Sequence, residues 1–290
     1  MPITLPSVSA PLVLPFYYAS LVNCVVHYQV DARRVEPFLA KTPLKAALFG
    51  GRASVAFNFQ AYSAQFSGGR GAPAAQWPTS CIGVTQEVEL NIVAYPAAQA
   101  ALLPEVSFEQ WVMGDEQSKL MGNHRVFVPC DSDNAIQAGI ELFGEPKFKT
   151  TFGVNLPSFN PVRKADVSVF EPDWVDAWSF RVNDPETPAN DIFTCVADLA
   201  GLRRTPGNVS SIVEYGVHDN RAIACRWNIL QPLDTYWLTA DDARRVTLSY
   251  GRSSHPMQKA MRELLDGAHA QAVQTFLSAP AAIQSRAVFI

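Results

Sequence analysis

The residues best suited to covalent chemistry lie in one short segment, DNAIQAGIELFGEPKFKT, between Asp133 and Thr150. This segment contains Lys147 and Lys149, one on each side of Phe148. A lysine amine attacks a carbonyl group only when it is neutral, and an ordinary lysine with a pKa of ~10.4 is almost fully protonated at neutral pH. Burial in apolar surroundings or a neighbouring positive charge lowers that pKa and turns the amine into a nucleophile.

The spacing of the two lysines decides whether they can interact. Pro146 favours an extended backbone for Glu145, and if the chain continues as a strand, Lys147 and Lys149 point to the same face. On a buried face, each ammonium group would then make protonation of the other harder. The alternative is a pair of solvated lysines at a helix–strand junction, which the rarity of buried lysine favours. Both interpretations stay open on spacing alone.

The elements that must position this segment are mainly strands. Alternation and β-branched residues predict strands at 23–30, 53–62, 85–95, 109–113, 124–129, 165–170, 177–182, 221–230 and 244–250. Helical spacing predicts helices at 30–40 and 134–143, and one or two helices within 255–279. The second of these has Asp133 as its N-cap and Gly144 as its C-terminal stop. Because strands and helices do not alternate regularly, we expect one α+β domain over residues 1–290, built on an antiparallel sheet or barrel.

Composition excludes several classes of partner. The 290 residues carry a formal net charge of −4 and no run of Lys or Arg, so neither nucleic acid nor a membrane surface is expected as a partner. We find no apolar stretch of membrane-spanning length, no export signal, and five widely spaced cysteines. We therefore expect a cytoplasmic protein with reduced thiols. Nucleotide-binding, metal-binding and serine-hydrolase motifs are all missing from the sequence.

The lysine segment resembles that of a known family. Gly139, Glu141, Pro146 and Lys147 match, in register and without a gap, the segment around the Schiff-base lysine of the acetoacetate decarboxylase family. In that family, a Gly-Arg-Glu helix and an aromatic-containing turn precede Pro-Lys-Lys. The resemblance covers roughly residues 20–250, and its specific part is the lysine segment. It implies an antiparallel β-barrel or cone with a few flanking helices, an imine-forming Lys147, no cofactor or metal, and a homo-oligomer.

The resemblance also suggests partners for the lysine. The strand at 85–95 is similar to a family strand with an acidic residue, which places Glu87 on the family's active-site glutamate and leaves Glu89 as the alternative. Acetoacetate decarboxylase is itself the usual example of a lysine activated by a neighbouring cation. Here Phe148 replaces the adjacent lysine, so either Lys149 supplies the charge or Phe148 lowers the pKa by excluding water.

The arginines that the family carries near its substrate carboxylate are missing. Ile140 replaces the arginine of Gly-Arg-Glu, and no arginine precedes Arg33. Arg125 could hold a substrate carboxylate by a bidentate contact instead, unless it is a surface residue at a strand start. Arg70, in a long loop of small residues, could close over a substrate. Tyr250 is a candidate acid–base phenol whose alternative is a packing role.

We therefore predict a Schiff-base enzyme that acts on a small or medium keto acid. The first expectation is decarboxylation of a β-keto acid through a Lys147 imine, with Glu87 positioning the substrate or moving protons. The second is an aldol or dehydration reaction at the same lysine, because the arginines are missing. The third is a non-catalytic binder of an apolar keto acid or carboxylate. Its barrel would be lined by Phe57, Phe59, Leu90 and Ile92.

Overall fold

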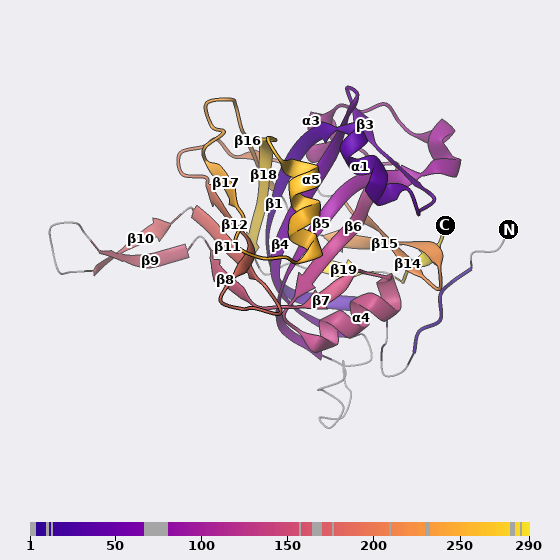
Figure 1. The fold of residues 1–290 in the computed structure, drawn as a ribbon, viewed down its shortest axis with the longest axis horizontal. Helices are drawn as coiled ribbons and strands as arrows, with labels where there is room; N and C mark the ends of the chain where they lie inside the picture. The colour runs from indigo at the N-terminus through magenta and orange to yellow at the C-terminus, as the bar shows by residue number, and fades with distance from the viewer. Residues whose placement is uncertain are drawn as a thin grey trace.

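Strands dominate the computed structural model (Figure 1). It describes residues 4–9, 12, 14–66, 81–156, 158–163, 170–175, 177–208, 210–229, 233–278, 282–284 and 286–290. The largest sheet contains β1 (Phe16–Asp31), β2 (Leu44–Ala46), β3 (Leu48–Phe49), β4 (Arg52–Phe66), β5 (Cys81–Pro96), β6 (Gly122–Cys130), β7 (Lys147–Lys149), β13 (Thr205–Pro206), β14 (Ile212–His218), β15 (Arg221–Ile229), β16 (Asp234–Trp237), β18 (Ala270–Ser278), β19 (Ala282–Gln284) and β20 (Val288–Phe289).

Two smaller sheets and a few helices complete the fold. One sheet has four strands, β8 (Phe152–Asn155), β11 (Ala177–Asn183), β12 (Asp191–Asp198) and β17 (Val246–Ser249). The other is a hairpin that extends away from the body in Figure 1, β9 (Ser158–Arg163) and β10 (Phe170–Val175). The helical elements are α1 (Ala32–Leu39), the 3₁₀ helix η3 (Ala97–Leu102), α3 (Phe108–Val112), α4 (Asp133–Phe143) and α5 (Pro256–Leu265).

The large sheet curls until its pairing returns to β1. This strand pairs with β18 and β19 on one side and with β4 on the other, and β15, β14, β6 and β5 connect β19 to β4. Most pairs are antiparallel, whereas β14 and β7 run parallel to β6. Only two residue pairs join β14 to β6, so the wall is a curled sheet rather than an evenly closed barrel. The mainly antiparallel fold with few helices is confirmed, and the predicted barrel or cone is only approximated.

Alternation along the long strands sorts side chains onto the two faces of this sheet. On β4, Val55, Phe57 and Phe59 are fully buried in the main apolar core, as the alternation predicted. Asn58 and Gln60, between and beyond them, line cavities on the inner face of the curl. Period-two alternation therefore places apolar residues outward and polar residues inward.

The outward apolar residues pack against the four-stranded sheet. Phe180 of β11 stacks on Phe59 with 5.1 Å between the ring centroids, and it meets the ring of Phe57 edge-on at 5.8 Å. Leu90 and Ile92 of β5 belong to the same core. These four apolar residues of β4 and β5 were predicted to line a ligand-binding barrel. That prediction is wrong, because they lie on the face of the large sheet that packs against the four-stranded sheet.

The first two predicted helices begin and end close to the predicted positions. α4 starts with Asp133, but its N-cap is Ser132, whose hydroxyl accepts a bond from the Ala135 N–H at 3.4 Å. Asp133 is therefore the first helical residue rather than the cap. Gly144 ends the helix in the left-handed region, as predicted. Figure 1 shows α5 lying over the strands of the large sheet and α4 at its lower edge, beside β7.

Two predicted elements have the wrong type. Residues 108–112 form α3 instead of a strand, because Ser107 and Gln110 make a reciprocal capping box that starts a helical turn. Residues 270–278 form β18 instead of a continued helix, because α5 ends at Leu265 and the chain then pairs along β1. The strand predicted at 165–170 lies almost wholly outside the described residues.

The structure bears on two expectations, the absence of a membrane span and the presence of reduced thiols. Within the described residues, no helix is both long and apolar enough to cross a membrane. The sulfur atoms of Cys24, Cys130, Cys195 and Cys225 are buried thiols rather than disulfides. Burial raises the pKa of the Cys130 thiol to about 12, which is typical of a small core side chain rather than a reactive one.

A substitution at Gly144 tests the contact between α4 and β14. Gly144 has a φ of 60°, and a Cβ at this position would overlap the backbone of Val217. We expect Gly144→Ala to lower the free energy of unfolding by ~3 kcal/mol, partly through the left-handed backbone and partly through the collision. Urea unfolding followed by circular dichroism measures this loss.

Gly201 provides the matched control for that variant. Its φ is 72°, but no atom lies within 4 Å of an added Cβ. Gly201→Ala should therefore cost only ~1 kcal/mol, the conformational part of the effect. Equal losses for the two variants would contradict the importance of the α4–β14 contact.

Candidate active site

Lys147 is the first residue of β7, directly after the turn that follows α4. Gly144 leads the chain out of the helix, and the Lys147 N–H donates to the Glu145 carbonyl at 2.8 Å across Pro146. β7 then pairs in parallel with β6, where Lys147 lies opposite Val128. This tight turn directs the side chains of Glu145 and Lys147 into the same cavity on the inner face of the sheet.

Gly139 makes room for the lysine side chain. It lies in α4, and a Cβ added to it would lie 2.6 Å from Lys147 Cε and would also collide with the Glu145 carboxylate. Only a residue without a side chain lets the lysine stem pass this close to the helix. The Gly139 match to the family segment therefore has a direct steric reason.

The Lys147 ammonium group is held between two carboxylates. Its Nζ lies 2.6 Å from Glu87 Oε2 and 3.0 Å from Glu145 Oε2, and its side chain is 4% exposed. Glu87, on β5, also accepts bonds from the Tyr62 hydroxyl at 3.0 Å and from the Gln60 amide. A buried ammonium group needs such partners, because an unpaired charge in the interior is strongly destabilising.

This arrangement reverses the predicted activation of the lysine. Burial acts to lower the pKa of Lys147, but Glu145 and Glu87 outweigh it and hold that pKa well above the ordinary lysine value. Lys149 does not lower the pKa as predicted, because its ammonium group pairs with Asp133 at the surface and not with these carboxylates. The resting lysine is therefore protonated, and it must transfer a proton to a neighbour before it can attack a carbonyl.

Arg125 lies behind the carboxylates rather than in the cavity. Its Nη1 is 2.7 Å from Glu145 Oε1, 2.9 Å from Glu214 Oε2 and 3.9 Å from Glu89 Oε1. The guanidinium group is 1% exposed, and the residue does not line the space around Lys147. It is thus engaged in fixing the carboxylates and is not placed to bind a substrate carboxylate beside the lysine.

The carboxyl groups of the site are pushed toward different protonation states. Burial, helped by Glu214, raises the pKa of Glu89 to about 8. Burial also raises the pKa of Glu214, against the opposing effect of Arg125. Burial works in the same direction on Glu145, but Arg125 and Lys147 prevail and keep its pKa below the ordinary value. At neutral pH the site therefore contains an ionised Glu145 and a protonated Glu89.

The cavity beside these groups is narrow. Among the described residues that line it, Lys147 is the only cationic side chain. Tyr18 and Trp227 add a phenol and an indole, and no described group accepts a bond from the buried Trp227 Nε1. This N–H is a donor suited to a substrate oxygen. Within the described chain, no group of three or more His, Cys, Asp or Glu residues is arranged to hold a metal.

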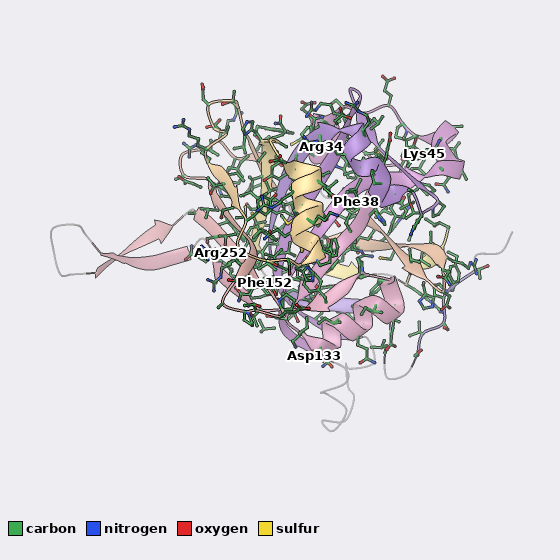
Figure 2. The ribbon with its side chains drawn as sticks, in the orientation of Figure 1. Arg34, Phe38, Lys45, Asp133, Phe152 and Arg252 are labelled. Atoms are coloured by element: carbon green, nitrogen blue, oxygen red, sulfur yellow. The ribbon has the colours of Figure 1, made fainter. Side chains whose placement is uncertain are left out.

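Lys149 and Phe148 lie outside this cavity. Lys149 Nζ pairs with Asp133 Oδ1 at 2.8 Å, and its side chain is 51% exposed; Figure 2 labels Asp133 at the lower edge of the molecule. The ring of Phe148 packs against His255, with 4.4 Å between the centroids. The expectation that the two lysines of β7 share a buried face is thus wrong, since the ion pair with Asp133 draws Lys149 outward.

Tyr250 and Arg70 also do not contribute to the described site. The Tyr250 ring lies 4.2 Å from the Arg262 guanidinium carbon in a cation–π contact, away from Lys147. Arg70 falls outside the described residues. Of the predicted site residues, the structure brings together Lys147, Glu87 and Glu89, with Arg125 behind them.

Sequence reasoning did not single out several residues that the fold adds to the site. Glu145 directly precedes Pro-Lys, so its place in the motif was a usable signal. Glu214, Tyr18 and Trp227 come from strands far from the lysine in sequence. No local pattern marks which face of those strands turns toward Lys147.

Comparisons with known proteins agree with this architecture. No family model matches the sequence, and no curated protein matches it. Among solved structures, the enduracididine biosynthesis enzyme MppR superposes with a TM-score of 0.61 at 12% identity, covering 96% of this chain and 88% of MppR. An acetoacetate decarboxylase-like enzyme from Sphingomonas wittichii RW1 gives 0.56 at 13% identity, covering 95% of this chain and 92% of that one.

An acetoacetate decarboxylase from Legionella pneumophila has the same architecture. Its TM-score is 0.53 at 7% identity, with 96% of this chain and 88% of that chain covered. The chain therefore has an acetoacetate decarboxylase-like fold, and the resemblance noted around Lys147 is confirmed at the level of the fold.

A substitution at Gly139 tests whether lysine position controls reactivity. We expect Gly139→Ala to displace the lysine stem and to slow trapping of Lys147 by a keto acid and borohydride by at least ~10-fold, because misplacement of a reacting group is costly. It should also lower the free energy of unfolding by ~1–3 kcal/mol, because displacing Lys147 disturbs its buried ion pairs. Gly153→Ala is the control, because its added Cβ would meet only ordinary contacts at 3.5 Å and beyond. Equal trapping in the two variants would contradict the steric argument.

The raised pKa of Glu89 predicts how stability depends on pH. A carboxyl group with a higher pKa in the folded state binds its proton more tightly there, so its contribution is full below about pH 4.5 and is lost as the pH rises through about 8. The free energy of unfolding of Glu89→Gln should therefore fall less steeply with rising pH across that window than that of the unaltered protein. The difference in slope should be up to ~1.4 kcal/mol per pH unit. Urea unfolding at several pH values measures the slope. Glu263→Gln, at an exposed position of α5, should leave the slope unchanged, and an unchanged slope for Glu89→Gln would contradict the prediction.

Proposed function

We propose that this protein is a Schiff-base enzyme in which Lys147 forms an imine with the ketone of a keto acid. The observation that carries the proposal is a buried lysine amine, enclosed in a cavity and placed 2.6 Å and 3.0 Å from two carboxylates. A purely structural ion pair has no need of a cavity at the amine. The acetoacetate decarboxylase-like fold supports the same interpretation.

Imine formation begins with proton transfer from the Lys147 ammonium group to Glu87. The neutral amine adds to the ketone carbon and gives a carbinolamine. A protonated carboxyl group then donates to the departing hydroxyl, which leaves as water, and a protonated imine remains. Its positive nitrogen replaces the lysine charge between Glu87 and Glu145, so the carboxylates that raise the pKa of the lysine also stabilise this intermediate.

The geometry supports an aldol-type or dehydration reaction best. An ionised Glu145 can take a proton from the carbon next to the imine, and the electrons of the C–H bond move to nitrogen to give an enamine. The enamine carbon can bond to an aldehyde carbon, and the protonated Glu89 can donate to the alkoxide that forms. Two carboxyl groups with pKa values pushed apart are the usual arrangement for such a base and acid. The neighbour MppR was solved with pyruvate and with the condensation product of pyruvate and imidazole 4-carboxaldehyde.

Decarboxylation of a β-keto acid is the second candidate. The electrons of the breaking C–COO⁻ bond would move into the imine, CO₂ would leave, and the enamine would take a proton. A substrate carboxylate facing Glu87 and Glu145 is repelled, which favours its loss, and two of the similar structures are named acetoacetate decarboxylases. This route ranks second because Arg125 is engaged with Glu145 and Glu214, so no described cation of the cavity other than Lys147 helps the substrate carboxylate to bind.

Borohydride trapping tests the proposal directly. The protein is incubated separately with pyruvate and with acetoacetate, reduced with borohydride, and digested for mass spectrometry. We expect a reduced adduct on Lys147 with at least one compound. An adduct on Lys147 that retains the carboxylate supports aldol or dehydration chemistry, whereas an acetoacetate adduct that has lost CO₂ supports decarboxylation.

Three variants serve as controls for the trapping. Lys147→Ala should abolish the adduct, and Lys149→Ala, two residues away and exposed, should retain it. Lys147→Arg keeps the positive charge but cannot form an imine. If Lys147→Arg retains ligand binding and no keto acid gives an adduct with the unaltered protein, the Schiff-base proposal is wrong and the protein is a binder.

A further inference from the structure

A second, larger cavity lies on the inner face of the curled sheet, and we call it the distal chamber. It is bordered by β1, β4, β5, β6, β14, β15 and β18. Partly exposed residues at its rim, Gly114, Lys119 and Ser210, come from loops at the surface. The distal chamber therefore reaches from these loops into the interior.

The distal chamber lies next to the cavity of Lys147 along the same strands. Gln60 and Glu89 line the lysine cavity, and two residues further along their strands Asn58 and Asn91 line the distal chamber. Trp227 and Ile229 of β15 repeat this relation. Residues two apart on a strand share a face and lie about 7 Å apart. The two spaces are therefore successive levels of one interior.

The boundary between the two levels is a row of side-chain amides at Glu89. Asn58 Nδ2 and Asn91 Nδ2 donate to Glu89 Oε2 at 3.4 Å and 3.1 Å. Asn23 Nδ2 in turn donates to Asn58 Oδ1. The amide nitrogens of all three asparagines thus donate to a neighbour within this row. The arrangement leaves the Oδ1 atoms of Asn23 and Asn91 as buried acceptors to which no described group donates.

His27 adds a third acceptor of the same kind. Gln274 Nε2 donates to the Val112 carbonyl at 2.6 Å and to the Thr235 hydroxyl at 3.1 Å, so its Oε1 faces His27 Nε2 at 2.9 Å. The proton of the imidazole must therefore lie on Nε2, which makes Nδ1 an acceptor. Burial lowers the pKa of His27 to about 4, so the ring is neutral.

The register of the strands leaves space between two of these acceptors. His27 of β1 and Asn91 of β5 both lie opposite Ala56 of β4. The methyl group of Ala56 leaves open the space that a larger residue would fill. Asn23, His27 and Asn91 are 1%, 7% and 1% exposed, so an apolar occupant would leave three buried acceptors without a donor.

We propose that the distal chamber binds the non-reacting arm of the substrate, and that this arm is uncharged and carries several hydroxyl groups. The inference rests on the proposed function, because it assigns the arm to the keto acid whose carbonyl reaches Lys147. Hydroxyl groups supply the donors that Asn23, His27 and Asn91 lack. The lining of the distal chamber includes Glu116 and Lys119, one charge of each sign, so a charged arm gains no net attraction from them.

A matched pair of keto acids tests this inference. The first is 2-oxohexanoate, and the second is its 4,5,6-trihydroxy derivative, which has the same chain length. Binding is measured by calorimetry with Lys147→Arg, which keeps a positive charge beside Glu87 and Glu145 and cannot form an imine. We expect the hydroxylated compound to bind at least ~10-fold more tightly, since each new hydrogen bond to a buried acceptor contributes about 1 kcal/mol.

A variant that fills the distal chamber provides the second arm of the test. Ala56→Leu, made in the Lys147→Arg background, should abolish the preference for the hydroxylated compound. In the otherwise unaltered chain it should leave trapping of pyruvate on Lys147 unchanged, because pyruvate has no arm. Ala61→Leu, on the opposite face of β4, is the control. If Ala56→Leu fails to fold, the preference measured with Lys147→Arg alone still decides the question.

The possible outcomes separate this inference from the proposed function. Trapping of pyruvate together with equal affinity for the two six-carbon acids would overturn the inference and leave the Schiff-base proposal intact, with only water in the distal chamber. A clear preference without any trapping would support a hydroxyl-binding chamber and contradict the Schiff-base proposal. Equal affinity without trapping would overturn both.

Discussion

The ion pair of Lys147 with Glu87 and Glu145 is the interaction on which the rest of the site depends. Burying an ammonium group costs several kcal/mol unless charged partners meet it at close range. Here Glu145 comes from the turn that presents the lysine, and Glu87 comes from the middle of β5. Arg125 then compensates the negative charge of Glu145 from the opposite side. Removing one of these residues would leave another buried charge without its partner.

This network gives the lysine a different kind of activation from that of a lysine beside a second cation. A neighbouring cation lowers the pKa of the amine and keeps it neutral at rest. In this protein the carboxylates keep the amine protonated at rest, and one of them lies where it can accept the proton when a carbonyl arrives. The same carboxylates make the resting lysine harder to deprotonate, but they also stabilise the cationic imine that forms afterwards.

The curled sheet separates packing from chemistry. Its outer face holds the aromatic core that joins it to the four-stranded sheet, with Phe57, Phe59 and Phe180 in direct contact. Its inner face carries the amides and carboxyls of two successive cavities. Strand alternation makes this separation possible, because neighbouring residues on one strand serve opposite faces. Burying so many polar groups on the inner face costs stability, and the apolar contacts of the outer face offset that cost. Such a group of buried polar residues is typical of functional sites.

Local sequence determined the backbone around the lysine. Gly144 requires the end of α4, Pro146 requires an extended approach to Lys147, and the alternation of β4 and β5 fixes which residues share a face. Local rules failed where a cap or a distant partner outweighed them. The capping box at Ser107 made a helix of an apolar run, and pairing with β1 made a strand of residues 270–278.

Only the tertiary structure decided which of the two faces is the inner one and which groups meet there. Lys147 and Glu87 are 60 residues apart, and they meet because β5 pairs with β6 and β6 pairs with β7. The same pairing placed Lys149 at the surface, which the spacing of the two lysines had left open. A periodic pattern states that residues share a face, whereas the surroundings of that face, and hence the pKa of a lysine on it, depend on contacts between distant segments.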